Sequence, residues 1–136
     1  MANNMIFVNL PSKNLPKTKE FWQKLGYSFN PQFTDDNAGC LVISDTIYAM
    51  LLTEDYYKTF TDKQIADTSR TQETQLALST DSREEVDQML SKALAAGATE
   101  PKPAQDMEGF MYSRGFDDLD GHHWDYVWMN PSAVQG

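Results

Sequence analysis

The stretch "FDDLDGHHWDYVWM", residues 116–129, combines a turn, a strand and a cluster of chemically active side chains. Its acidic portion "DDLDG" (117–121) has the composition of a tight turn. The aromatic and apolar residues that follow are typical of a strand. Together with "GFMYSRGF" (109–116) just before it, the stretch predicts a β-hairpin. Histidine and aspartate this close together also suit a metal site, so the stretch raises a question of chemistry as well as of fold.

The residues upstream of the hairpin predict a strand, a helix and an edge strand. "ETQLALST" (73–80) reads as a strand, and Ser82 and Glu85 form an S-x-x-E capping box at a helix start. Gly97 is placed to end this helix. The two prolines of "ATEPKPAQDM" (98–107) suit an edge strand. The predicted apolar stripe of the helix consists of Val86, Met89, Leu90, Ala93 and Leu94.

The first half of the chain repeats this order. "MIFVNL" (5–10) predicts a strand, and Asn14, Pro16 and Gly26 mark the ends of a helix. Residues 27–53 predict three antiparallel strands. Residues 54–71 predict a linker with a helical turn near 62–67, either a solvated connection or a lid over a pocket. The predicted buried face of the first helix consists of Leu15, Thr18, Phe21, Trp22 and Leu25.

Both halves therefore predict a β-α-β-β-β module. The step from Phe7 to Asn14 has the same length as the step from Gln75 to Ser82, which indicates an internal duplication. The predicted fold class is α+β, with a curved eight-stranded mixed sheet and helices on its outer face. We expect one domain over 4–130, with module 1 at 4–53, the linker at 54–71 and module 2 at 72–130.

Composition excludes several classes of function. A formal net charge of -9 disfavours nucleic acid and anionic membrane as partners, because both require clustered Lys and Arg. The single cysteine, Cys40, rules out an intrachain disulfide and a CxxC zinc motif. The start of the sequence has no basic and apolar signal pattern, and no window resembles a membrane span. We therefore expect a cytoplasmic protein.

Strand alternation sorts the candidate side chains of the hairpin. Neighbouring residues on a strand point to opposite faces, so His122 and His123 cannot serve one site. His123 and Asp125 share a face, and we expect that face to line a concave interior opposite the helices. A mostly apolar hollow with a few polar groups is typical of a small-molecule site.

These residues resemble a known family. The paired modules, "LPSKNLPKTKEFWQKLGY" (10–27) and "DLDGHHWDY" (118–126) are similar to the vicinal-oxygen-chelate superfamily of glyoxalase, bleomycin-resistance and extradiol dioxygenase proteins. The resemblance is closest to bacterial proteins described as lactoylglutathione lyase-like. It implies a homodimer and, in members with metal chemistry, one ligand on each of the first, fourth, fifth and last strands.

Carried over to this sequence, the four metal positions fall on Phe7, near Met50, on Gln75 and on Asp125. Phe and Met are not ligands for a hard or borderline divalent ion, and Gln is a weak one. His123 lies on the correct face, but with Asp125 it supplies only two ligands. The sequence therefore favours no cofactor; a Zn, Ni, Fe or Mn site on His123, Asp125 and Gln75 is the alternative. Without a metal, His123 and Asp125 would orient a ligand, act as an acid–base pair or satisfy each other.

Other side chains have open alternatives. Arg114, on one side of its strand with Tyr112 and Phe116, either faces inward and holds an anionic ligand or faces outward and pairs with an acid. Asn9 is a further ligand-binding candidate. Two more sets of residues are candidates only from their place in the strands. The first set either forms pocket walls or packs in the core, and consists of Phe7, Tyr48, Met50 and Tyr112. The second set, Trp124 and Trp128, is expected to pack beneath a helix.

Three functions follow as hypotheses. The first is a glyoxalase/bleomycin-resistance-like protein that binds a small molecule on the concave sheet face, through Phe7, Asn9, Met50, Gln75, Tyr112, Arg114, His123 and Asp125, without a catalytic metal. The second is a metal-dependent enzyme, a lyase or a dioxygenase, with an atypical ligand set. The third is a domain whose interior is filled by its own side chains and whose role is association.

Overall fold

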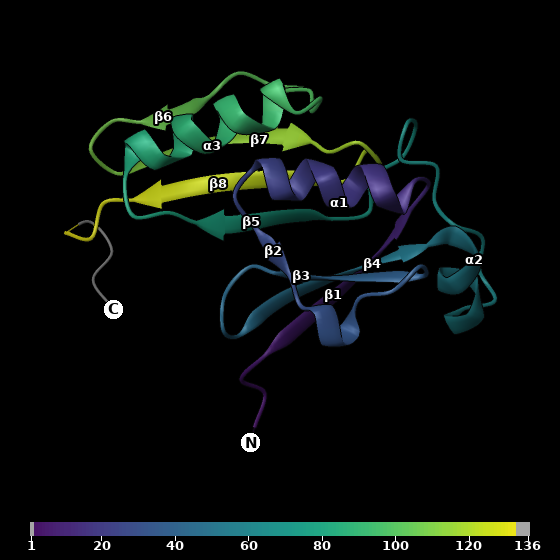
Figure 1. The fold of residues 1–136 in the computed structure, drawn as a ribbon. Coiled ribbons are helices and arrows are strands. Elements are labelled where there is room, and N and C mark those ends of the chain that lie inside the picture. Colours follow the sequence, from purple (N-terminus) through teal and green to yellow (C-terminus); the bar gives the residue numbers. More distant parts are fainter. Residues whose placement is uncertain (1, 133–136) are drawn as a thin grey trace. The chain divides into compact units, whose positions relative to one another are not determined.

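The computed structural model describes residues 2–132 and contains two compact units that divide between Asp67 and Thr68. Each unit holds four strands and a long helix (Figure 1). The first unit contains β1 (Ile6–Ser12), α1 (Leu15–Lys24), β2 (Ser28–Phe29), a 3₁₀ turn (Pro31–Phe33), β3 (Ala38–Val42), β4 (Ile47–Thr53), α2 (Glu54–Tyr57) and a second 3₁₀ turn (Lys58–Phe60). The second unit contains β5 (Gln75–Ser79), α3 (Arg83–Ala95), β6 (Gln105–Met107), β7 (Met111–Asp117) and β8 (His123–Met129).

The sheet of the first unit has the strand order β1-β4-β3-β2, with β1 parallel to β4 and the other pairs antiparallel. Asn14 caps α1, because its side-chain oxygen accepts a hydrogen bond from the Lys17 amide at 3.2 Å. Gly26 follows the helix with φ of +102°, a conformation that glycine adopts without strain. All five residues of the predicted buried face are buried, which confirms that prediction.

The sheet of the second unit has the order β5-β8-β7-β6, and α3 packs along β7 and β8 (Figure 1). The Ser82 side chain accepts a hydrogen bond from the Glu85 amide at 3.1 Å, which confirms the predicted helix start. The core beneath α3 is formed by Val86, Leu90, Ala93, Phe116, Trp124 and Tyr126. The apolar face of β8 therefore meets the helix, as predicted for Trp124.

The two units repeat one pairing scheme, which confirms the α+β class and the two β-α-β-β-β modules. Phe7 pairs with Tyr48 between β1 and β4, and Gln75 pairs with His123 between β5 and β8. Two residues further along each ladder, Met50 of β4 is therefore equivalent to Asp125 of β8.

Three details differ from the sequence-based expectations. Over residues 2–132 the strands form two four-stranded sheets and not one of eight strands. Each module pairs its last strand with its own first strand, and within this range no strand of one module pairs with a strand of the other. The helical turns of the linker lie at 54–60 and not at 62–67, because Thr53 caps the Tyr56 amide and two acids occupy the first turn. Leu94 is exposed and does not belong to the buried stripe of α3.

The division between the units falls inside the predicted linker. No helix in residues 2–132 is long and apolar enough to cross a membrane. The tail expected after Asn130 lies mostly outside the described residues, since the description ends at residue 132.

The turn between β7 and β8 is built around the buried carboxylate of Asp118. One oxygen accepts hydrogen bonds from the amides of Asp120 and His122, and the other accepts from the indole nitrogen of Trp124 at 2.9 Å. Burial raises the pKa of Asp118, while the charge of His122 and the hydrogen bond from Trp124 oppose the rise. This carboxylate fixes the turn and the packing of Trp124 together.

The substitution Asp118→Ala should lower the free energy of unfolding by about 2–4 kcal/mol, because it leaves buried N–H groups without an acceptor. Glu108→Ala, which removes an acid from an exposed turn, is the control and should change it by less than about 0.5 kcal/mol. Urea unfolding followed by tryptophan fluorescence measures both. Equal effects of the two substitutions would show that the turn does not depend on Asp118.

Candidate functional site

His123 of β8 is held between two carboxylates. Its Nδ1 lies 2.8 Å from Oδ1 of Asp117, and its Nε2 lies 3.0 Å from Oδ1 of Asp125. The side chain of His123 is only 12% exposed, while those of Asp117 and Asp125 are 32% and 25% exposed. Asp117 is the residue of β7 that pairs with His123 across the hairpin, so the three side chains lie on the same face of the sheet.

This arrangement favours the protonated imidazole. A neutral imidazole has one N–H and can donate to only one carboxylate, whereas the imidazolium donates to both. Burial alone would lower the pKa of His123, but the hydrogen bonds to Asp117 and Asp125 and their charges outweigh it, so the pKa of His123 lies above its ordinary value. The group is therefore a carboxylate–imidazole–carboxylate triad in which both acids favour the protonated form of His123.

The backbone of Gly115 makes room for the triad. Gly115 of β7 pairs with Asp125 of β8. A Cβ atom at this position would overlap Oδ1 of Asp125 and would lie 2.7 Å from Nε2 of His123. Neither Gly115 nor Asp117 is among the residues predicted from the sequence. The available signal for Gly115 is a glycine within a strand, which often marks a close approach.

A cleft of about 130 Å³ lies against the triad. All of its lining residues belong to the second unit: Gln75, Lys102, Pro103, Gln105, Ser113, Arg114, Gly115, His123 and Asp125. Four of the predicted site residues, Gln75, Arg114, His123 and Asp125, therefore line one cleft. The residues that line the cleft carry polar groups: amide, ammonium, carboxylate and hydroxyl.

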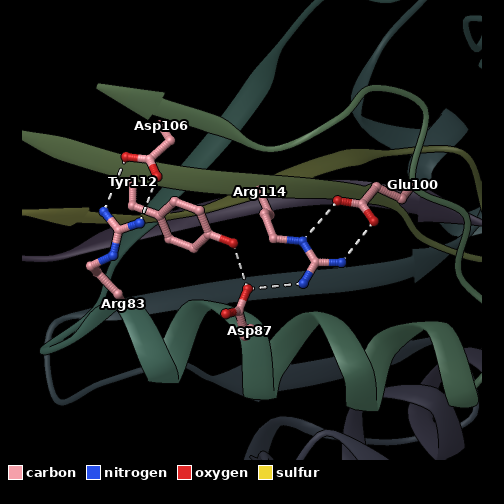
Figure 2. Close-up of polar contacts among 6 residues, drawn as sticks. All are labelled: Arg83, Asp87, Glu100, Asp106, Tyr112 and Arg114. Atoms are coloured by element: carbon pink, nitrogen blue, oxygen red, sulfur yellow. Dashed lines mark hydrogen bonds and ion pairs between the residues drawn. The ribbon is translucent and has the colours of Figure 1, made fainter. Parts of the chain in front are cut away.

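The side chains of Tyr112 and Arg114 point to the other face of the sheet, toward α3 (Figure 2). The guanidinium of Arg114 binds both oxygens of Glu100, at 2.9 and 2.8 Å, and also Asp87 of α3 at 3.0 Å. These bonds, with Glu100 first, raise the pKa of Arg114. Tyr112 donates to Asp87, and this bond raises the pKa of the Tyr112 hydroxyl. Of the two alternatives for Arg114, the structure shows pairing with acids; its ligand binding stays a prediction.

The remaining predicted residues lie in the first unit. Phe7 is 52% exposed and stacks on Tyr48 with ring centroids 5.1 Å apart. The Asn9 amide donates to the carbonyl oxygen of Phe7 at 3.1 Å, and Met50 is half-buried. Cys40 is buried, and burial raises the pKa of its thiol, which does not favour a nucleophile. Ligand binding by Phe7, Asn9 and Met50 stays a prediction.

The residues at the four expected metal positions do not fit a divalent ion. Phe7 offers no donor atom, Met50 offers a soft thioether, and Gln75 offers only an amide oxygen. Oδ1 of Asp125 is bound to His123, so a metal ion would have to compete with this ring for the carboxylate. Residues 2–132 contain no group of three or more His, Cys, Asp or Glu placed to hold a metal ion.

This geometry defines a class of protein: a duplicated α+β chain with a polar cleft on the sheet face opposite the helix. A family model described as Glyoxalase/Bleomycin resistance protein/Dioxygenase superfamily matches residues 5–126. The chain therefore belongs to this superfamily, and the resemblance found in the sequence is confirmed. No curated protein matches the chain in sequence.

Solved structures share the fold. A hypothetical protein, SA1046 from S. aureus, is 25% identical, with 94% of each chain covered and a TM-score of 0.78. A family enzyme from Burkholderia phytofirmans is 17% identical, with 90% of this chain and 96% of that chain covered and a TM-score of 0.75. The fosfomycin resistance protein FosX from Listeria monocytogenes, complexed with Mn(II) and sulfate, is 18% identical, with 98% and 95% covered and a TM-score of 0.71.

Asp125→Asn should lower the pKa of His123, because it removes one of the two negative charges that favour the imidazolium. In the wild type, a raised pKa contributes stability that is present below the unfolded-state value and is lost as pH rises through the folded-state value. Asp125→Asn should therefore weaken this fall in stability with rising pH. NMR titration of the imidazole carbons, with His122 as internal reference, measures the pKa; an unchanged or higher value would contradict the triad.

Gly115→Ala should break the bond between His123 and Asp125 and lower the free energy of unfolding by about 1–3 kcal/mol, because the added methyl group occupies the space of the two side chains. Ser113→Ala, on the same face of β7, adds no atom and should have little effect. Chemical denaturation gives the free energies, and the pKa of His123 in Gly115→Ala reports the lost bond. A variant as stable as wild type, with an unchanged pKa, would contradict the close approach.

Proposed function

We propose that this protein binds a small polar molecule in the cleft beside His123 and that the binding needs no metal ion. The observation that carries the proposal is the triad: Oδ1 of Asp117 and Oδ1 of Asp125 each contact His123, and His123 and Asp125 line a cleft together with further polar groups. Such preformed polar groups orient a ligand because their positions are fixed before it binds.

The same cleft supports this proposal over the hypothesis of a domain that serves only for association. That hypothesis requires side chains of the protein to fill the sheet face opposite α3, and the cleft lies on this face. The metal-dependent lyase or dioxygenase remains the second candidate, favoured by family membership and by the Mn(II) complex of FosX. The donor chemistry of Phe7, Met50 and Gln75 supports the metal-free proposal against it. The homodimer implied by the family resemblance stays a prediction.

Two titrations test the proposal on the whole chain. In the first, chelator-treated protein is titrated with Mn²⁺, Zn²⁺, Ni²⁺ and Fe²⁺ by calorimetry, and we expect no stoichiometric binding in wild type or Asp125→Ala. In the second, amide NMR shifts are recorded with small sugars, diols, amines, carboxylates and aromatic compounds. We expect at least one class to shift Gln75, Ser113 and Gly115 together.

Ser113→Leu fills the cleft without touching the triad and should abolish these shifts. Ser91→Leu, an equal change on the exposed side of α3, should leave them intact. One ion bound per chain and lost in Asp125→Ala would instead support the metal-dependent enzyme. Shifts that persist in Ser113→Leu would place the binding elsewhere.

A further inference from the structure

The cleft contains polar side chains that have no partner among the described residues. Among residues 2–132, the side chains of Lys102, Gln75 and Gln105 make no hydrogen bond or ion pair, although all three line the cleft. Oδ2 of Asp125 is likewise unbonded within that range, since its contact with His123 uses Oδ1. The lining therefore includes a lysine and an aspartate oxygen that are available to a bound molecule.

Lys102 is carried by a segment that is fixed at both ends. Glu100, before it, accepts hydrogen bonds from Nε and Nη2 of Arg114 at 2.9 and 2.8 Å. Asp106, after it, is bound by Arg83 at 3.1 and 2.6 Å. Figure 2 shows the two pairs on the α3 side of β7. Bidentate pairs fix orientation as well as distance, so they limit the movement of the segment.

The sequence of the segment adds to this restraint. Pro101 and Pro103 flank Lys102, and each proline fixes its own φ and restricts the residue before it. Arg83 also lies over the ring of Tyr112, 4.4 Å from its centroid, which anchors the second pair to β7. The ammonium group of Lys102 is thus presented to the cleft from a stiff support.

We propose that the molecule bound in the cleft is a small carboxylate that also carries a hydroxyl or ammonium donor. Lys102 binds the carboxylate, and Oδ2 of Asp125 accepts the hydrogen bond of the donor. The volume of about 130 Å³ is well below the roughly 300–1,000 Å³ of pockets for drug-sized ligands, so the ligand has only a few heavy atoms. This inference rests on the proposed function and names the ligand class for the same cleft.

Arg114 and Arg83 have a positioning role in this proposal. Their guanidinium groups touch no ligand, but they hold the segment that presents Lys102. Replacement of Arg114 by Lys keeps the charge and removes the fork that binds both oxygens of Glu100. Arg114→Lys should therefore weaken the binding of a carboxylate ligand only when Lys102 is present.

Four matched probes test the ligand class by NMR titration of the whole chain. L-Lactate and L-alanine carry a carboxylate and a donor, propionate carries only the carboxylate, and lactamide carries the hydroxyl without the charge. We expect lactate or alanine to bind with a dissociation constant on the order of millimolar, and propionate and lactamide to bind more weakly. The difference between lactate and alanine tells a hydroxyl donor from an ammonium donor.

Three variants assign the contacts. Lys102→Gln should weaken the better acid by about tenfold and leave lactamide unchanged, whereas Lys92→Gln, an equal loss of charge on exposed α3, should change neither. Asp125→Asn should weaken the better acid and lactamide but not propionate. Arg114→Lys should weaken the binding of the better acid when Lys102 is present. It should have no further effect on this binding when it is combined with Lys102→Gln.

The outcomes separate this inference from the proposed function. Lactamide binding as tightly as lactate, or Lys102→Gln behaving like Lys92→Gln, would overturn the ligand class while leaving the cleft as a binding site. No shift at Gln75, Ser113 or Gly115 with any of the four probes would also overturn the ligand class. The wider set of sugars, diols, amines and aromatic compounds then judges the proposed function by itself.

Discussion

The second unit depends on the buried carboxylate of Asp118. It accepts hydrogen bonds from two amides of the turn and from the indole of Trp124. It therefore fixes both the hairpin and the face on which Trp124 lies. Because side chains alternate along a strand, a shift of one residue would exchange the two faces of β8. With Trp124 directed to the core, His123 and Asp125 must lie on the open face. The position of the candidate site therefore follows from a contact that is not part of it.

Alternation separates two kinds of polar chemistry on β7. Tyr112 and Arg114 face α3, where acids of the helix and of the following segment bind them. Ser113 and Gly115 line the cleft on the other face, which they share with Asp117. The partly exposed ion pairs toward α3 contribute more to geometry than to stability. Under the proposed function, one strand combines support on one face with ligand binding on the other.

Much of this arrangement could be predicted from local patterns. The helix caps at Asn14 and Ser82, the glycines at the helix ends and the common face of His123 and Asp125 all follow from spacing along the chain. The partners of those residues could not be predicted in the same way. Asp117 reaches His123 only because the hairpin register pairs them, and Glu100 reaches Arg114 only because the segment before β6 folds back. Contacts between strands depend on register and on long-range packing, which local patterns do not contain.

The duplication shows how the two modules have diverged at equivalent positions. Phe7, Tyr48 and Met50 occupy in the first unit the places that Gln75, His123 and Asp125 occupy in the second. The first set is aromatic and apolar, while the second is polar and contains an acid that is bound to the imidazole of His123. A divalent ion would have to find ligands where the first module offers a ring and a thioether, and would have to displace His123 from Asp125. The same fold therefore presents different chemistry through substitutions at a few register positions, which is why family membership fixes the architecture here and leaves the ligand to be argued from the cleft.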